Sequence, residues 1–168
     1  HKATNNDKLH FLKLDLSSLS SIRECSDNFD KLESSLDILI NNAGVLSPLA
    51  RTSDNFEMNM GVNHLGHFLL TNLLLDMLKS NPAPSRIIIV ASQTYMVGSI
   101  NKEDFNSEKN FSNVWMHYSN SKLANLLFMH EMAKKLTGTT VTCNALCPGT
   151  VQTEAARYLN PVMKFFRS

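Results

Sequence analysis

The sequence predicts an α/β fold with a doubly wound parallel sheet. Three observations predict it. Short apolar segments alternate with longer helical ones, the segment Leu36–Ile40 suits a strand buried on both faces, and the expected strands end in polar or Gly/Pro-containing turns. This order favours helices on both faces of the sheet and ligands beyond the carboxyl ends of its strands. We expect residues 1–168 to form a single, incomplete domain.

Four elements are expected in the first half of the chain. Leu9–Leu14 has the apolar pattern of a short strand. A helix follows from a serine cap at 17 or 18 to about residue 32, with apolar residues at helical spacing. Leu36–Ile40 is the next strand. A long helix then spans roughly Asn55–Lys79, where a turn with two prolines stops it.

The second half continues the alternation. Arg86–Ala91 contains four β-branched residues in a row and is the strongest strand of the sequence. The polar stretch 92–113 is expected to be a long loop. A helix spans about Val114–Leu136 and is stopped by Gly138, and Thr140–Leu146 is the last expected strand.

Composition excludes several classes of protein. Apolar residues make up 43% of the chain and charged residues 18%, which is typical of a folded domain rather than a disordered one. The formal charge of +1 gives no electrostatic reason to expect a nucleic acid partner. No apolar run reaches the ~18 residues of a membrane span.

Cysteine and histidine do not predict a metal site. The three cysteines are an odd number and indicate an intracellular, reducing compartment. Cys143 and Cys147 are expected to have structural roles as small buried residues. His64 and His67 lie three positions apart without a cluster of further ligands, so we expect packing or pocket lining from them rather than metal binding.

Tyr118 and Lys122 are four residues apart in an expected helix and therefore share a face. The reference pKa of a phenol is ~10, which makes it a poor base at neutral pH. A nearby ammonium favours the phenolate, and lowering that pKa by two requires ~2.7 kcal/mol of stabilisation. The pair is therefore a candidate for general acid/base chemistry, and the alternative is a packed tyrosine beside a solvated lysine.

Two further side chains are candidates for the same site. Ser92 follows the strand 86–91, where parallel sheets present their ligands, and its hydroxyl can hydrogen-bond a substrate oxygen; the alternative is a serine that only caps the strand end. Asn63 is an unfavourable residue inside a helix, and glycines flank it. Either close packing against the sheet explains this choice, or a bent helix holds a water there next to Lys122.

Several motifs in this order resemble the short-chain dehydrogenase/reductase family. They are NNAG at 41–44, VNHLGHF at 62–68, VAS at 90–92, YSNSK at 118–122 and PGTVQT at 148–153. The resemblance covers nearly all of the chain. The residues of these motifs are most similar to those of the retinol dehydrogenase branch of the family.

The resemblance implies a role for each of the four candidate catalytic residues. Tyr118 is the general acid/base, and Lys122 lowers its pKa and holds the nicotinamide ribose. Ser92 orients the substrate oxygen, and Asn63 completes the proton relay. Together they imply an oxidoreductase that transfers a hydride between NAD(P) and a lipophilic, retinol-like alcohol, ketone or aldehyde. The alternative is a catalytically silent relative that binds cofactor or protein partners, and the four intact candidates argue against it.

The resemblance also implies a nicotinamide cofactor, NADP or NAD. Asp15 is expected near the adenine edge, residues 41–44 near the adenosine half and residues 148–153 on the nicotinamide side. Besides Tyr118 and Lys122, the expected cofactor contacts are Asp15, Leu16, Asn41, Ala43, Gly44, Pro148, Gly149, Val151 and Thr153.

One family feature is absent from the sequence. No glycine occurs before Gly44, whereas the family holds the cofactor pyrophosphate on a glycine-rich turn after its first strand. The resemblance therefore implies a Rossmann-type doubly wound sheet that lacks its first βαβ strands, and we expect those strands upstream of His1. We expect the 168-residue chain to be inactive and the complete protein to be active. The resemblance further allows a homodimer. It also allows association with a membrane, at the endoplasmic reticulum or elsewhere, through a segment upstream of His1.

Overall fold

The structure of the chain is a computed structural model that describes residue 6, residues 8–111 and residues 113–149. Its sheet has three parallel strands in the order β1-β2-β3, which confirms the predicted parallel α/β architecture. Ile38 of the first strand is paired with Arg86 of the second, which is paired with Thr142 of the third. The strands are β1 (Ile38–Asn41), β2 (Ser85–Val90) and β3 (Val141–Leu146).

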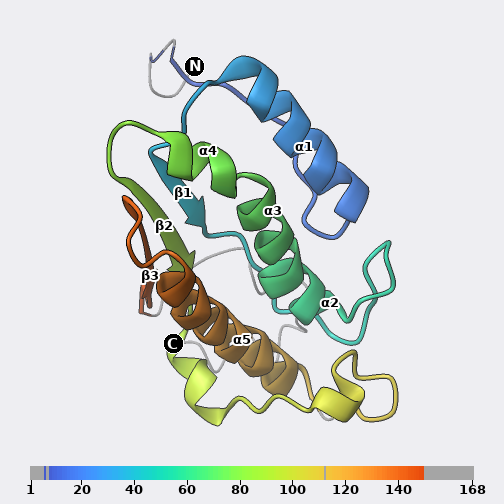
Figure 1. Cartoon of the computed structure of the whole chain (residues 1–168). Coiled ribbons are helices and arrows are strands. Elements are labelled where there is room, and N and C mark those ends of the chain that lie inside the picture. Colours follow the sequence, from blue (N-terminus) through green and yellow to red (C-terminus); the bar gives the residue numbers. More distant parts are fainter. Residues whose placement is uncertain (1–5, 7, 112, 150–168) are drawn as a thin grey trace.

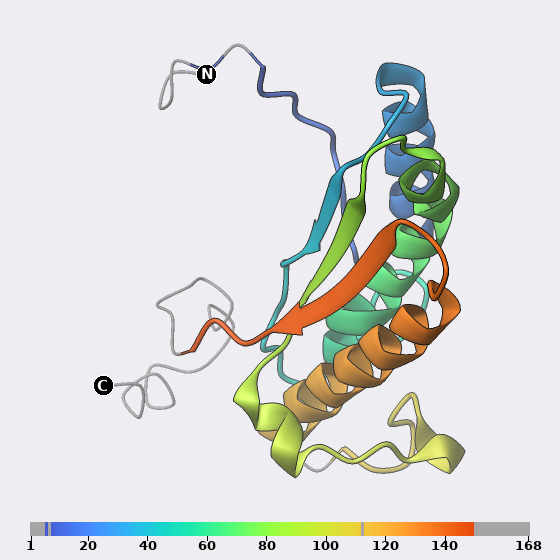
Figure 2. The same cartoon turned by 60° about the vertical axis from the view of Figure 1, so that its left-hand side comes forward.

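The helices of the described chain all cover one face of this sheet (Figures 1 and 2). Strand order follows chain order, and right-handed crossovers that run in one direction place their helices on the same side. Helices on both faces, as the sequence predicts, are therefore not found within the described residues. The helices are α1 (Leu19–Leu32), α2 (Met58–Met60), α3 (His67–Leu73), α4 (Leu75–Ser80) and α5 (Val114–Lys135).

β1 is exposed on its uncovered face. Ile38 and Ile40 are 48% and 59% exposed, whereas Leu39 between them packs against the core. Side chains alternate across a strand, so one set faces the helices and the other faces away from them. The prediction that this strand is buried on both faces is therefore wrong for the described chain.

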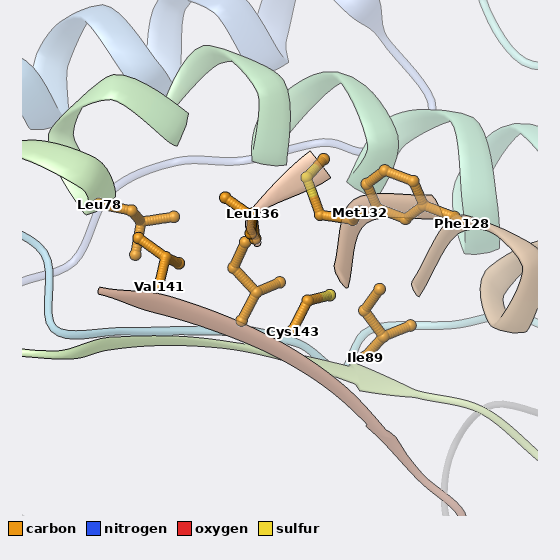
Figure 3. Packing of buried hydrophobic residues seen from close by; sticks show 8 residues of the cluster. Leu78, Ile89, Phe128, Met132, Leu136, Val141 and Cys143 are labelled. Atoms are coloured by element: carbon orange, nitrogen blue, oxygen red, sulfur yellow. The ribbon is translucent and has the colours of Figure 1, made fainter. Parts of the chain in front are cut away.

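The main core lies between the covered face of the sheet and helices α4 and α5 (Figure 3). Leu78 and Ile87 are completely buried, and Phe128 and Met132 of α5 pack into the same cluster. Burying each such side chain contributes about 1.5–3 kcal/mol. This packing fixes α5 against the sheet and so determines where the functional candidates on α5 lie.

The segment Leu9–Leu14 is not a strand, contrary to prediction. It is an extended stretch without strand pairing, and its apolar side chains Leu9, Phe11 and Leu14 are 46%, 89% and 39% exposed. A strand needs the backbone of a neighbour for its hydrogen bonds. No described strand lies beside this segment, so its apolar pattern alone does not form a ladder.

The long helix expected over Asn55–Lys79 is divided into several pieces. It begins only at Met58, after an N-cap at Glu57, and continues through a π-helical segment, η1 (Gly61–Gly66), before α3 and α4. Asn63 lies in this π-helical segment, which agrees with the bent helix that was one of the two explanations for an asparagine at this position. Such π-helical insertions are frequent at functional sites.

The remaining predicted elements are confirmed with small shifts at their ends. α1 follows the cap Ser18, and α5 follows the cap Asn113; each side chain accepts a backbone N–H of the first turn. Within the described residues, no helix has both the length and the apolar character needed to cross a bilayer. The loop 92–113 contains two 3-10 turns, η2 (Gln93–Val97) and η3 (Lys102–Asp104).

Candidate active site

Two side chains of α5 form the centre of the candidate site. Tyr118 and Lys122 lie on one side of the helix, as their spacing predicts, and the Lys122 Nζ atom is 5.5 Å from the centroid of the Tyr118 ring. At this distance an ammonium interacts with the aromatic ring. The structure therefore places the ammonium beside the ring, and a role of this pair in acid/base chemistry stays a prediction.

Lys122 is buried at the carboxyl end of the sheet. Its side chain is only 4% exposed, and Nζ donates a 3.0 Å hydrogen bond to the carbonyl of Val90 at the end of β2. Burial lowers the pKa of Lys122 to about 8, and the charge of the nearby Cys147 opposes this effect. The ammonium is therefore still mostly protonated at pH 7 and loses its proton near pH 8.

The Asn63 side chain ties three parts of the site together. It is fully buried, its Oδ1 accepts the N–H of Val45 at 2.7 Å, and its Nδ2 donates to the Val45 carbonyl at 2.9 Å. Nδ2 also donates to Ser121 Oγ at 3.0 Å. Asn63 therefore connects η1 to the segment after β1 and to α5.

The Asn63 backbone carbonyl lies in the same π-helical segment and accepts a hydrogen bond from His67 Nδ1 at 3.1 Å. Burial lowers the pKa of His67 to about 4, the backbone hydrogen bond to Asn63 raises it, and the charge of Lys122 lowers it further. The ring is therefore neutral at pH 7, with the proton on Nδ1. A water held at this carbonyl beside Lys122 stays a prediction.

Sequence reasoning missed the contributions of Ser121 and His67 to this network. Ser121 is fully buried, and its Oγ donates a 2.6 Å hydrogen bond to the carbonyl of Tyr118 while it accepts from Asn63. Its position next to Lys122 on the helix is the only signal that the sequence offers. The sequence presents His67 as a packing residue, and its contact with the Asn63 carbonyl follows only from the local helix geometry.

Ser92 lies directly after β2, where the sequence places it, and caps η2. The turn η2 packs against α5, the helix that carries Tyr118, as the yellow-green segment of Figure 2 illustrates. The hydrogen bonds of the Ser92 side chain within the described residues involve Thr94. The role of Ser92 toward a substrate oxygen therefore stays a prediction.

Gly44 borders the buried lysine. A Cβ atom at this position would lie 3.3 Å from Asn63 Oδ1 and 3.6 Å from Lys122 Nζ. The absence of a side chain keeps this approach to the two polar groups clear. Gly44 is thus the part of the NNAG motif that the structure brings to the site.

Asn41 of the same motif has a structural contact. Its side chain is buried, and Nδ2 donates a 2.8 Å hydrogen bond to Thr71 Oγ1, which links β1 to α3. Its Oδ1 has no hydrogen-bond partner among the described residues. Ala43 is exposed, so its predicted contact with a cofactor stays a prediction.

Asp15 and Leu16 end the extended N-terminal segment. Asp15 Oδ1 accepts the backbone N–H and the hydroxyl of Ser17 at 2.9 and 2.7 Å, and these hydrogen bonds lower the pKa of Asp15. Leu16 is buried against η1, where a Cβ on Gly66 would lie 2.7 Å from the Leu16 carbonyl oxygen. Their contact with the adenine side of a cofactor stays a prediction.

The nicotinamide side of the predicted site is described as far as Gly149. Pro148 and Gly149 are exposed after β3, and the φ of +77° at Gly149 is a left-handed conformation that favours glycine. Val151 and Thr153, the two other residues predicted on this side, lie outside the described residues.

The described part of the chain contains no group of three or more His, Cys, Asp and Glu side chains placed to bind a metal. His64 packs against Phe68 and Phe128, with ring centroids 6.1 and 6.0 Å away. Cys143 is buried as expected, whereas Cys147 is exposed, so the prediction of a buried structural role for Cys147 is wrong.

Comparisons of this chain with known proteins agree on one protein family. The family model for short chain dehydrogenases matches residues 1–164. The chain is 54% identical over 149 residues to retinol dehydrogenase 14 of Mus musculus, which covers 88% of this chain and 44% of that protein. It is 49% identical over 156 residues to retinol dehydrogenase 11 of Homo sapiens, which covers 92% and 48%. The chain thus spans about half the length of these relatives.

Solved structures resemble the chain in fold and sequence. A crystal structure of an uncharacterised protein from Mycobacterium paratuberculosis has 43% identity and a TM-score of 0.74, over 86% of this chain and 52% of that chain. The RhlG/NADP active-site complex of Pseudomonas aeruginosa has 27% identity and a TM-score of 0.65, over 89% and 57%. The second of these proteins was crystallised with NADP.

Proposed function

Because the chain belongs to the short-chain dehydrogenase family, we propose that the complete protein is an NAD(P)-dependent oxidoreductase. It transfers a hydride between the nicotinamide cofactor and a lipophilic, retinol-like alcohol, ketone or aldehyde. Tyr118 exchanges the proton of the substrate oxygen, and Lys122 makes that exchange feasible near neutral pH. Ser92 holds the substrate oxygen, and Asn63 maintains the path by which the proton reaches solvent.

The observation that carries this proposal is the placement of a buried ammonium beside the Tyr118 ring. Lys122 Nζ lies 5.5 Å from the ring centroid, and the lysine is buried from water by the surrounding chain. A charge in a partly dry environment acts more strongly on a neighbour than one in water. The Lys122 ammonium therefore stabilises the phenolate of Tyr118 and lowers the cost of moving a proton at its Oη.

The space beside Asn63 and Lys122 supports a bound cofactor. Gly44 leaves open the space in front of Asn63 Oδ1 and Lys122 Nζ, which a side chain at position 44 would fill. When bound, the cofactor supplies or accepts the hydride. The residues proposed to hold it are Asp15, Leu16, Asn41, Ala43, Gly44, Tyr118, Lys122, Pro148, Gly149, Val151 and Thr153. No glycine precedes Gly44 in this sequence, so its pyrophosphate requires residues beyond these 168.

The substrate class rests on the relatives. The two relatives described above are named retinol dehydrogenases, and they are 49–54% identical to this chain over 149–156 residues. Retinol is a long apolar molecule with one hydroxyl. We propose a substrate of the same kind, in which the single oxygen is held by Ser92 and Tyr118.

The proposal includes a homodimer of the complete protein and membrane association through a segment upstream of His1. The helices α3 and α5 carry large exposed apolar side chains, among them Phe68 at 45%, Trp115 at 43% and Leu127 at 52%. Apolar side chains exposed on these two helices favour contact with a second copy. Sedimentation of the complete protein tests this part: a monomer at micromolar concentration contradicts it.

The experiment that tests the function compares two tyrosine variants of the complete protein. Tyr118→Phe removes one hydroxyl, and Tyr95→Phe removes an equivalent hydroxyl from an exposed side chain on η2. Retinaldehyde is the substrate, with NADPH or NADH as the cofactor. General acid/base catalysis contributes about 10²–10⁴-fold, so turnover by Tyr118→Phe should fall by that factor.

Cofactor affinity and the Tyr95→Phe control complete the experiment. We expect both variants to bind the cofactor as the unmodified protein does, and Tyr95→Phe to keep its turnover. Full turnover by Tyr118→Phe would show that the assigned residue is wrong. If the unmodified protein binds the cofactor but reduces neither retinaldehyde nor other lipophilic carbonyls, the catalytic function is wrong and the binding scaffold is the better explanation.

A further inference from the structure

The hydroxyl of Ser92 has a well-defined local partner, Thr94. Ser92 ends the connection from β2 and caps η2, and both residues are half-buried. The backbone N–H of Thr94 donates to Ser92 Oγ at 3.4 Å, and Thr94 Oγ1 donates to the same oxygen at 3.1 Å. Two donors from one residue therefore converge on a single hydroxyl oxygen.

This arrangement restricts what the Ser92 hydroxyl can do. A serine hydroxyl has two acceptor lone pairs and one hydrogen to donate. The N–H and the O–H of Thr94 occupy the two lone pairs. The Ser92 hydroxyl can therefore bind a further group through its hydrogen. Toward a ligand it acts as a hydrogen-bond donor.

The proposed reaction needs a hydrogen-bond donor at the substrate oxygen. The oxygen of a carbonyl substrate gains negative charge as hydride reaches the carbon, and a hydrogen-bond donor stabilises that charge. A hydrogen bond received by a hydroxyl also strengthens the one that it donates, because bonds in a chain polarise one another. The donors on Thr94 therefore make Ser92 a better donor.

We propose that Thr94 is a positioning residue that orients and polarises the Ser92 hydroxyl so that it donates to the substrate oxygen. This inference rests on the proposed function, because it requires Ser92 to bind that oxygen. Thr94 acts through Ser92 and does not itself touch the substrate. The backbone N–H of Thr94 would still donate to Ser92 without the threonine hydroxyl, so the effect is assigned to Thr94 Oγ1.

A purely structural role for Thr94 predicts a different pattern of effects. The same hydrogen bonds also cap η2, and a cap contributes to folding stability. A structural role would lower thermal stability and would leave the kcat of the folded enzyme unchanged. A positioning role acts on kcat for carbonyl reduction and disappears when Ser92 is removed.

The test is a double-mutant cycle in the complete protein, with retinaldehyde as substrate. Thr94→Val replaces the hydroxyl with a methyl group, and Thr94→Ser restores a hydroxyl. Loss of one such hydrogen bond in the transition state corresponds to about a tenfold decrease in kcat. We expect this decrease in Thr94→Val, an unchanged KM for the cofactor, and near-normal kcat in Thr94→Ser. Thr137→Val, at an exposed threonine after α5, is the matched control and should leave kcat unchanged.

The Ser92→Ala background separates this inference from the proposed function. We expect Ser92→Ala to lower kcat strongly and Thr94→Val to add no further decrease in that background. An equal decrease with and without Ser92, or a normal kcat in Thr94→Val while Ser92→Ala is impaired, overturns the role of Thr94 alone. Full kcat in Ser92→Ala overturns the assignment of Ser92 in the proposed function, and the role of Thr94 with it.

Discussion

Asn63 and Ser121 are joined by a 3.0 Å hydrogen bond that links the π-helical segment η1 to helix α5. The Ser121 hydroxyl in turn donates a 2.6 Å hydrogen bond to the carbonyl of Tyr118. The irregular turn in one helix is thus connected to the backbone at the acid/base candidate in another. The geometry of the site consequently depends on an asparagine that does not have to touch the substrate.

Replacement of Asn63 by alanine should destabilise the protein. The Asn63 side chain pairs with both the N–H and the carbonyl of Val45, and both groups would lose their partner. Leaving such groups unsatisfied costs about 2–4 kcal/mol in the free energy of unfolding. Urea denaturation of the complete protein measures this loss. Asn72→Ala, at an exposed asparagine of α3, is the control and should cost much less; equal losses would contradict the account.

Acidification should destabilise the protein through His67. Burial lowers its pKa from 6.5 to about 4, so the unfolded chain binds more protons than the folded one between these values. Stability is therefore lost as pH falls below about 6.5, and the loss is complete near pH 4. Between pH 7 and pH 5 the contribution of His67 to the free energy of unfolding falls by roughly 2 kcal/mol.

A histidine variant isolates this contribution. In His67→Gln, the loss of stability between pH 7 and pH 5, measured by urea denaturation, should shrink by roughly 2 kcal/mol. His130→Gln, at an exposed position on α5, should leave that loss unchanged. An identical pH dependence in His67→Gln and the unmodified protein would mean that His67 is not buried as the structure describes.

The helix α5 and the strand β2 could be predicted because their signals are local. Four β-branched residues in a row favour a strand, and a spacing of four places Tyr118 and Lys122 on one side of a helix wherever that helix packs. The segment Leu9–Leu14 has an equally local pattern but no backbone to pair with, so the same reasoning fails there. Strands, unlike helices, depend on a neighbour for every ladder hydrogen bond.

The contacts that complete the site could not be predicted, because they join residues distant in sequence. The bond between Asn63 and Ser121 spans 58 positions, and the bond from Lys122 to the Val90 carbonyl spans 32. The exposed face of β1 likewise follows from the direction of the crossovers, which its own residues do not encode. The unfavourable helix propensity of Asn63 was a local signal, but it did not distinguish close packing against the sheet from the bent helix that the π-helical segment provides.

The isolated 168-residue chain should give no turnover. Its sequence has no glycine before Gly44, so it does not contain the glycine-rich turn on which the family binds the cofactor pyrophosphate. We expect hydride transfer by the complete protein and none by residues 1–168 alone, in parallel assays with retinaldehyde and NADPH or NADH. Turnover by the short chain would mean that the pyrophosphate is bound in another way.

The central claim is that the Lys122 ammonium, 5.5 Å from the Tyr118 ring, allows the phenol to exchange protons near neutral pH. The most direct measurement is the pH dependence of kcat/KM for alcohol oxidation by the complete protein and by Lys122→Met. We expect the midpoint of the acidic limb to rise by about one to two pH units and the rate at pH 7 to fall by about 10–100-fold in the variant. The same midpoint in both proteins would contradict the claim.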